Sequence, residues 1–164
     1  MENKKISLYA IIIASYTCIS MLLGTFSFGM IQIRIAELLL VLCLEDLKYV
    51  LPVTLGCFLT NLIGILNGSD PMLLDLLVGT LATLLSALCV YLFKDFKLFN
   101  KPILSLLMPV IINGVMVGLE LSLYLNLNTL LMMLYVAVGE FISVTILGLL
   151  LYEPILKSIN HFRQ

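Results

Sequence analysis

The chain has 164 residues, of which 62% are hydrophobic and only 12% are charged, and its mean hydropathy is +1.15. Soluble globular domains carry roughly a quarter charged residues, so this composition excludes a soluble protein and indicates one integral membrane domain covering 1–164. The net charge of -1 excludes the strongly basic balance expected of a nucleic-acid-binding or polybasic lipid-surface protein.

Apolar segments follow one another along the whole chain. In chain order they cover 6–23, 33–47, 49–66, 71–93, 102–125 and 129–152. A helix that crosses a bilayer needs about 20 residues, so the second segment is short, and only Glu45, Asp46 and Lys48 separate it from the third. The sequence predicts an all-α integral membrane protein with six transmembrane helices.

The basic residues give the predicted topology an orientation. If six helices alternate in direction, all but one of these residues fall on the side of the termini: Lys4, Lys5, Lys48, Lys94, Lys97, Lys101, Lys157 and Arg163. Basic residues are enriched in cytoplasmic loops, so we expect both termini to be cytoplasmic. Arg34 alone lies on the outer side.

Acidic and amide side chains gather in the outer half of the predicted bundle. They are Glu37, Asp70, Asp75, Glu120, Glu140, Asn61 and Asn113. A charged residue near the bilayer centre costs about 2.5 to 3.5 kcal/mol on insertion scales, so several on separate helices favour a shared polar cavity. The alternatives are that the asparagines form interhelical hydrogen bonds, that Asp70 caps a helix, and that Glu120 faces outer water.

The segment from Gln32 to Glu37 holds the outer arginine. Arg34 and Glu37 can form an i,i+3 ion pair, or they can contact a ligand. One arginine against five acids leaves the outer side negative, which favours a cationic or donor-rich ligand. The preceding loop, 24–31, is either a simple connector or a lid over an outward-facing pocket.

Motifs for catalysis and metal binding are missing from the sequence. It contains no GxxxxGK[ST], HExxH or GxSxG motif, its four cysteines have no CxxC spacing, and its only histidine is His161. We therefore predict no enzyme, no metal and no cofactor. A binding or transport protein is the remaining class.

Several motifs resemble the QueT family of queuosine-precursor transporters. The matching residues are Ile31-Gln32-Ile33-Arg34-Ile35-Ala36-Glu37, Gly56-Cys57, Asn61-Leu62, Asp75, Gly79-Thr80-Leu81-Ala82-Thr83-Leu84, Asn113 and Gly139-Glu140. The residues after Glu37, including the Glu45-Asp46 pair, depart from the family's pattern and leave the ligand within the family open. This resemblance implies a substrate-binding S component of an energy-coupling factor importer in the prokaryotic cell membrane.

The resemblance also implies partners and a ligand. The partners are a transmembrane coupling subunit and two ATPases, and the AxxxA pair Ala10 and Ala14 would dock the coupling subunit. The ligand would be a 7-deazaguanine such as preQ1, preQ0 or queuine.

The predicted ligand contacts follow from the chemistry of a 7-deazaguanine. Glu140 would take the guanine-like edge, Asp75 or Glu37 a cationic arm, and Asn61, Asn113 and Arg34 the carbonyl and remaining ring nitrogens. The rival functions are an S component for another vitamin, an ion- or proton-coupled carrier, and a structural membrane subunit without a ligand.

Overall fold

A computed structural model describes residues 2–24, 32–68 and 73–163, and every element within them is helical. The long helices are α1 (Glu2–Leu22), α3 (Val50–Asn67), α4 (Asp75–Leu92), α5 (Ile103–Leu125), α6 (Thr129–Glu140) and α7 (Leu147–Arg163). Two 3-10 helices, η1 (Ile35–Leu44) and η2 (Leu47–Tyr49), lie between α1 and α3. A π-helical segment, η3 (Phe141–Ile146), joins α6 to α7 in one continuous helical run.

Within the part of the chain that the structure describes, five helices are long and apolar enough to cross a membrane. They are Lys5–Leu22, Leu47–Asn67, Asp75–Leu92, Ile103–Leu125 and Thr129–Ile159, and the shorter apolar helix Ile35–Leu44 accompanies them. The predicted all-α membrane architecture is confirmed. Residues 25–31 of the loop that we considered as a connector or a lid, and Asp70, which we considered as a helix cap, lie outside the described residues.

The predicted second helix differs from its expected form. In place of an α-helix over 33–47, the chain forms a ten-residue 3-10 helix. Asp46 has extended backbone angles (φ -158°, ψ 140°) and its side chain accepts a hydrogen bond from the Lys48 N–H, so the helix ends before it. A 3-10 helix rises about 2.0 Å per residue, so η1 covers roughly 20 Å, less than a bilayer core of about 30 Å.

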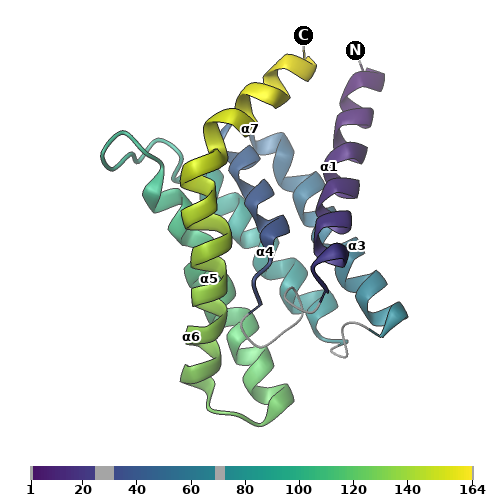
Figure 1. Cartoon of the computed structure of the whole chain (residues 1–164), viewed down its shortest axis with the longest axis vertical. Helices are drawn as coiled ribbons and strands as arrows, with labels where there is room; N and C mark the ends of the chain where they lie inside the picture. Colours follow the sequence, from purple (N-terminus) through teal and green to yellow (C-terminus); the bar gives the residue numbers. More distant parts are fainter. Residues whose placement is uncertain (1, 25–31, 69–72, 164) are drawn as a thin grey trace.

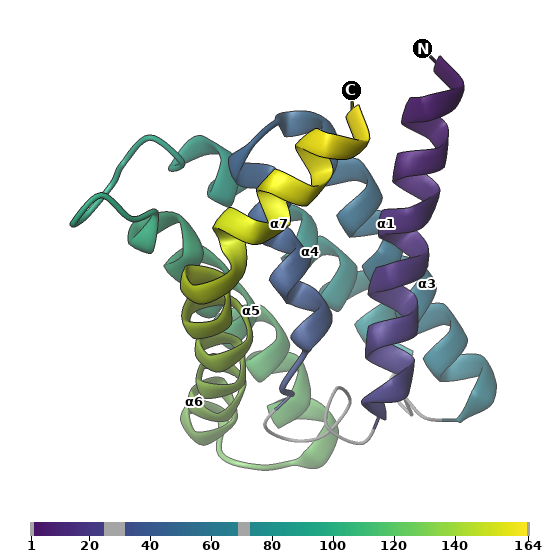
Figure 2. The same ribbon diagram turned by 45° about the horizontal axis from the view of Figure 1, so that its top comes forward.

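η1 is the centre of the bundle. It contacts α1, α3, α4, α7 and η3, while the long helices pack in sequence around it, α1 on α3, α3 on α4, α4 on α5 and α5 on α6. Figures 1 and 2 both show η1, in dark blue, between α1 and the α6–α7 run. Leu40, Val41, Leu42 and Cys43 of η1 are almost completely buried, which explains why this segment is so apolar.

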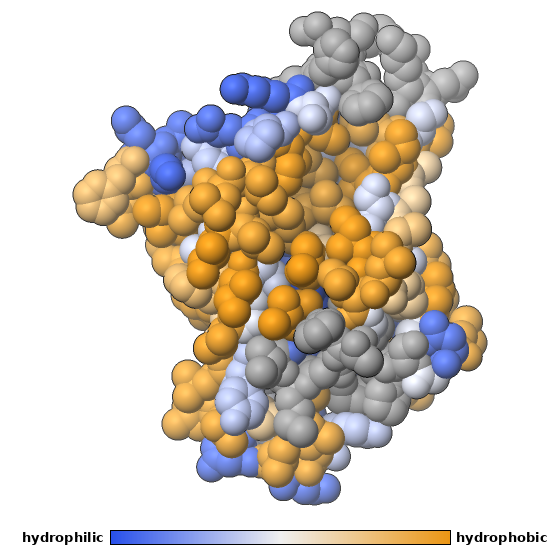
Figure 3. Space-filling view, in the orientation of Figure 1, coloured by the Kyte–Doolittle hydropathy of each residue, from blue (hydrophilic) through white to orange (hydrophobic). Residues whose placement is uncertain are grey.

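The outside of the bundle is suited to lipid. Figure 3 shows an apolar band between two hydrophilic ends, and Leu77, Leu81 and Leu85 of α4 are among the exposed large apolar side chains. Both termini lie at the same end (Figure 1), and η1 runs from the middle of the bundle toward that end. Inside the bundle, a Cβ on Gly118 would lie 2.5 Å from the Met133 Cα, so glycine is needed where α5 and α6 approach each other.

Candidate functional site: a buried polar cluster

The start of η1 has an unusual backbone. Gln32 has a φ of 45°, in the left-handed region that residues other than glycine seldom adopt. The Arg34 N–H donates to the Gln32 carbonyl at 2.9 Å, and the Glu37 N–H donates to the Arg34 carbonyl at 2.9 Å. This tight turn places both an arginine and a carboxylate in the interior, where Arg34 is 6% exposed and Glu37 is fully buried.

Arg34 pairs with a residue on another helix. Its guanidinium forms a buried ion pair with the Asp75 carboxylate at the start of α4. The alternative of an i,i+3 pair between Arg34 and Glu37 is wrong, because Arg34 extends to α4 while Glu37 accepts other donors. The Asn61 side-chain amide of α3 donates to the Asp75 backbone carbonyl at 2.8 Å, so three elements meet at Asp75.

Gly79 makes room for this arrangement. A Cβ at Gly79 would lie 2.3 Å from Asp75 Oδ1 and 2.9 Å from Asn61 Nδ2, closer than nonbonded atoms approach. The glycine one turn after Asp75 therefore permits the carboxylate and the amide to occupy the same small space. Asp75 Oδ1 and Asn61 Oδ1 are buried and have no hydrogen-bond partner within the described structure.

Two hydroxyl groups hold the Glu37 carboxylate. The Tyr16 hydroxyl of α1 and the Thr83 hydroxyl of α4 both donate to Glu37 Oε1, the second at 2.7 Å. Glu37 Oε2 is buried and has no partner among the described residues. One oxygen of this carboxylate is thus fixed by the protein, and the other is an open acceptor.

The second half of the cluster comes from α5 and α6. Glu140, the last residue of α6, is 1% exposed, and the Asn113 side chain of α5 lies close enough to interact with its carboxylate. Glu140 lies close enough to Glu37 and Arg34 to interact with both electrostatically. Glu140 Oε2 and Asn113 Oδ1 are buried without partners in the described part of the chain.

The π-helical segment η3 begins at Phe141, directly after Glu140. Such π segments are frequent at functional sites, because they shift the register of the side chains around them. Here the shift occurs next to a buried carboxylate with an open oxygen.

All six residues that the sequence singled out as candidate ligand contacts lie in this one buried cluster: Arg34, Glu37, Asn61, Asp75, Asn113 and Glu140. Sequence reasoning missed Tyr16, although a tyrosine inside an apolar span was a signal for it. Glu120, for which we considered an exposed position, is only 4% exposed and does not face water. Ala10 and Ala14, in contrast, are both exposed on α1.

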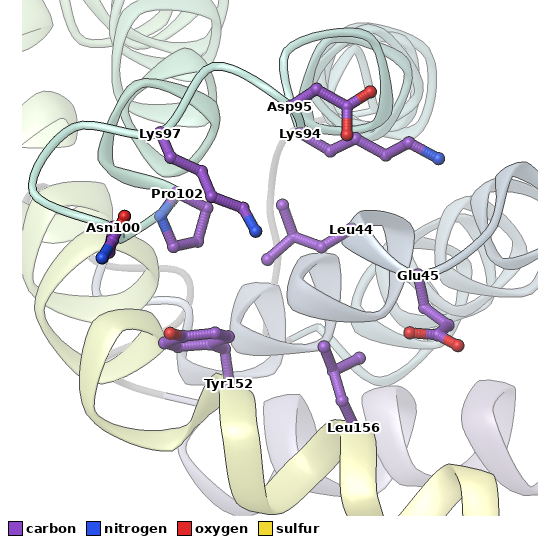
Figure 4. A pocket seen from close by; sticks show the side chains of 9 residues that line it. All are labelled: Leu44, Glu45, Lys94, Asp95, Lys97, Asn100, Pro102, Tyr152 and Leu156. Atoms are coloured by element: carbon purple, nitrogen blue, oxygen red, sulfur yellow. The ribbon is translucent and has the colours of Figure 1, made fainter.

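A pocket of about 300 Å³ lies elsewhere. Leu44 and Glu45 at the end of η1, the connection between α4 and α5, and Tyr152 and Leu156 of α7 line it (Figure 4). It contains none of the six clustered residues, which surround the opposite end of η1. Within residues 2–24, 32–68 and 73–163, no group of three His, Cys, Asp or Glu side chains is arranged to hold a metal ion.

The cluster has the chemistry of a binding site. Three buried carboxyl groups, Glu37, Asp75 and Glu140, lie in the cluster with the Arg34 guanidinium, and within the described structure five of their oxygens or neighbouring amide oxygens are open acceptors. Buried ionisable groups inside membrane bundles mark substrate or ion pathways. Fold and cluster together define a multi-pass membrane protein with a buried, acceptor-rich site.

Comparison with known proteins gives the family. The QueT transporter family matches residues 6–157, and the chain belongs to this family. It is 30% identical to the queuosine precursor transporter QueT of Lactococcus lactis subsp. cremoris (strain MG1363), over 92% of this chain and 91% of the relative. No solved structure is a significant match. A transporter family points away from an enzymatic role.

Proposed function

We propose that this protein binds a queuosine precursor, a 7-deazaguanine, in the buried cluster and takes part in its import. Membership of a transporter family and the similarity to a relative named as a queuosine precursor transporter support the transport role. The binding site is inferred from one observation: the buried acceptor oxygens around Glu37, Asp75 and Glu140 have no donors among the described residues.

The ligand's donors complement these acceptors. A 7-deazaguanine presents a ring N–H beside an exocyclic amine, and a carboxylate can accept both. Glu140 is suited to this edge, because its Oε2 is buried and has no partner among the described residues. The neighbouring Asn113 Oδ1 adds a further acceptor for the same edge.

A cationic arm, as in preQ1, would then lie near Glu37. Asp75 is less available for that arm, since its charge is already compensated by Arg34. Among the described residues, no arginine or lysine forms an ion pair with Glu37, and its Oε2 stays open. Of the two carboxylates that the sequence left open for this role, we therefore assign the cation to Glu37, and Arg34 and Asn61 to the positioning of Asp75 and to the ligand carbonyl.

The transport step depends on partners. We propose that the protein is an S component with cytoplasmic termini that docks a transmembrane coupling subunit through the exposed face of α1 around Ala10 and Ala14. Two ATPases would supply the energy. Small residues permit close helix packing, and Ala10 and Ala14 are exposed on α1, where a partner helix can approach them.

Binding to the purified protein tests the proposal. We expect preQ1, preQ0 or queuine to bind in titration calorimetry with the protein in lipid nanodiscs, and riboflavin and biotin not to bind. Binding of riboflavin or biotin alone would indicate an S component for another vitamin and would refute the proposed ligand. Uptake into vesicles that contain only this chain, without ATPases, would contradict the S-component role and favour an ion-coupled carrier.

A further inference from the structure

Tyr16 is the one described residue of α1 whose side chain bonds to a carboxylate of the cluster. It is 1% exposed, and its hydroxyl donates to Glu37 of η1. Its side chain also lies against α3, since a Cβ on Gly56 would be 2.7 Å from Tyr16 Cβ and 2.9 Å from Tyr16 Cγ. The absence of a side chain at Gly56 therefore lets α1 approach closely enough for the tyrosine to reach Glu37.

The opposite side of the same helix is exposed. Ala10, Ala14 and Cys18 are exposed at intervals of four residues. With 3.6 residues per turn, Tyr16 projects about 200° around the helix from Ala14. α1 thus has an exposed face of small residues and, on its other side, a hydrogen bond from Tyr16 to Glu37 in the proposed ligand site.

The geometry at Glu37 makes this bond sensitive to a ligand. Oε1 accepts from both Tyr16 and Thr83, and Oε2 has no donor among the described residues. A ligand cation at Oε2 attracts the carboxylate and turns it toward the cation. The length and direction of the hydrogen bonds at Oε1 then change. Thr83 is on α4, so Tyr16 is the donor through which this adjustment reaches α1.

We propose that Tyr16 is a positioning residue that couples occupancy of the Glu37 site to the exposed face of α1 formed by Ala10, Ala14 and Cys18. This inference rests on the proposed function, because it takes the ligand of that site as the signal. Ligand binding changes the position of α1 through Tyr16, and the face that meets the coupling subunit changes with it.

Cys18 provides a built-in probe of that face. It is exposed, whereas Cys43 and Cys57 are buried and Cys89 is half-buried. In a Cys89→Ala background, a nitroxide spin label attached at Cys18 reports the surroundings of α1 by electron paramagnetic resonance in nanodiscs. Binding is measured on the same samples by calorimetry with preQ1, preQ0 and queuine, and the tightest ligand is used for the spectra.

We expect the ligand to change the Cys18 spectrum when Tyr16 is present. Tyr16→Phe removes only the hydroxyl, so it should weaken binding by about tenfold, in line with one charge-assisted hydrogen bond, and abolish the spectral change at saturating ligand. Thr83→Val should weaken binding similarly but retain the spectral change, because its hydroxyl is not on α1. Tyr9→Phe, on the same helix, is the matched control and should behave as the parent.

The outcomes separate this inference from the function on which it rests. If the parent protein binds none of the three 7-deazaguanines, the proposed function fails and the coupling fails with it. If the parent binds but Tyr16→Phe shows the same ligand-induced spectral change, or if the parent spectrum does not respond to ligand, only the coupling role of Tyr16 is overturned.

Discussion

Replacing the Glu140 carboxyl group by an amide gives the sharpest mutational test of the site. Glu140 is 1% exposed, the Asn113 side chain lies close to its carboxylate, and Oε2 has no partner within the described structure. Glu140→Gln keeps the size of the side chain but replaces one acceptor oxygen by an N–H donor. A ligand donor that faced Oε2 would then meet another donor.

The size of the effect follows from the hydrogen bond that is lost. A hydrogen bond to a charged group contributes about 1.5 to 3 kcal/mol, which corresponds to a loss of affinity of roughly ten- to 150-fold. The fold should not be weakened, because a charge deep in a bilayer costs about 2.5 to 3.5 kcal/mol on insertion scales and the amide carries none. Glu140→Gln should therefore lower the affinity for the ligand without lowering the stability of the protein.

The assay is titration calorimetry in nanodiscs with a thermal unfolding measurement on the same sample. Glu153→Gln is the matched control, since Glu153 is exposed in α7 and lies outside the cluster. It should bind like the parent. An affinity of Glu140→Gln within twofold of the parent would refute the assignment of Glu140 to the ligand, and a loss of affinity accompanied by a large drop in melting temperature would show a structural role instead.

Three further predictions follow from the contacts described above. Asp75→Asn leaves Arg34 buried without its ion-pair partner, so it should destabilise the protein by about 3 to 5 kcal/mol. Adding Arg34→Met should restore the melting temperature without restoring binding. An unchanged melting temperature in Asp75→Asn would contradict a stabilising role of the ion pair. Gly79→Ala places a Cβ 2.3 Å from Asp75 Oδ1 and should reduce the affinity measured by calorimetry at least tenfold. Parent-like binding would show that the Asp75 and Asn61 side chains can move aside without loss of the site. Ala14→Trp fills the exposed face of α1 and should abolish precursor uptake by cells while the purified protein still binds ligand, and retained uptake would refute docking there.

Much of the bundle could be predicted because lipid imposes a simple pattern. The long apolar segments predict α1, α3, α4, α5 and the α6–α7 run to within a few residues at most ends. η1 was mispredicted as an α-helix because hydrophobic runs carry no information about 3-10 geometry. Its short length and its central position follow from the turn at Gln32 and the extended backbone at Asp46, which are tertiary features of this packing.

The residues of the cluster could also be identified from the sequence, but the contacts between them could not. Arg34, Asp75 and Glu140 were conspicuous because charged residues are rare in apolar helices. The pairing of Arg34 with Asp75 needs the approach of η1 to α4, and no local spacing rule predicts a contact 41 residues apart. Tyr16 escaped notice because a single tyrosine in a membrane helix is common, and only its bond to Glu37 gives it a role.

The central claim is that the buried cluster holds a queuosine precursor. The most direct test is mass spectrometry of small molecules released from the protein after purification from cells supplied with preQ1, preQ0 and queuine. The account predicts that the parent releases a 7-deazaguanine and that Glu140→Gln releases little of it at equal protein concentration. Equal release by both proteins, or release of an unrelated vitamin by the parent, would contradict it.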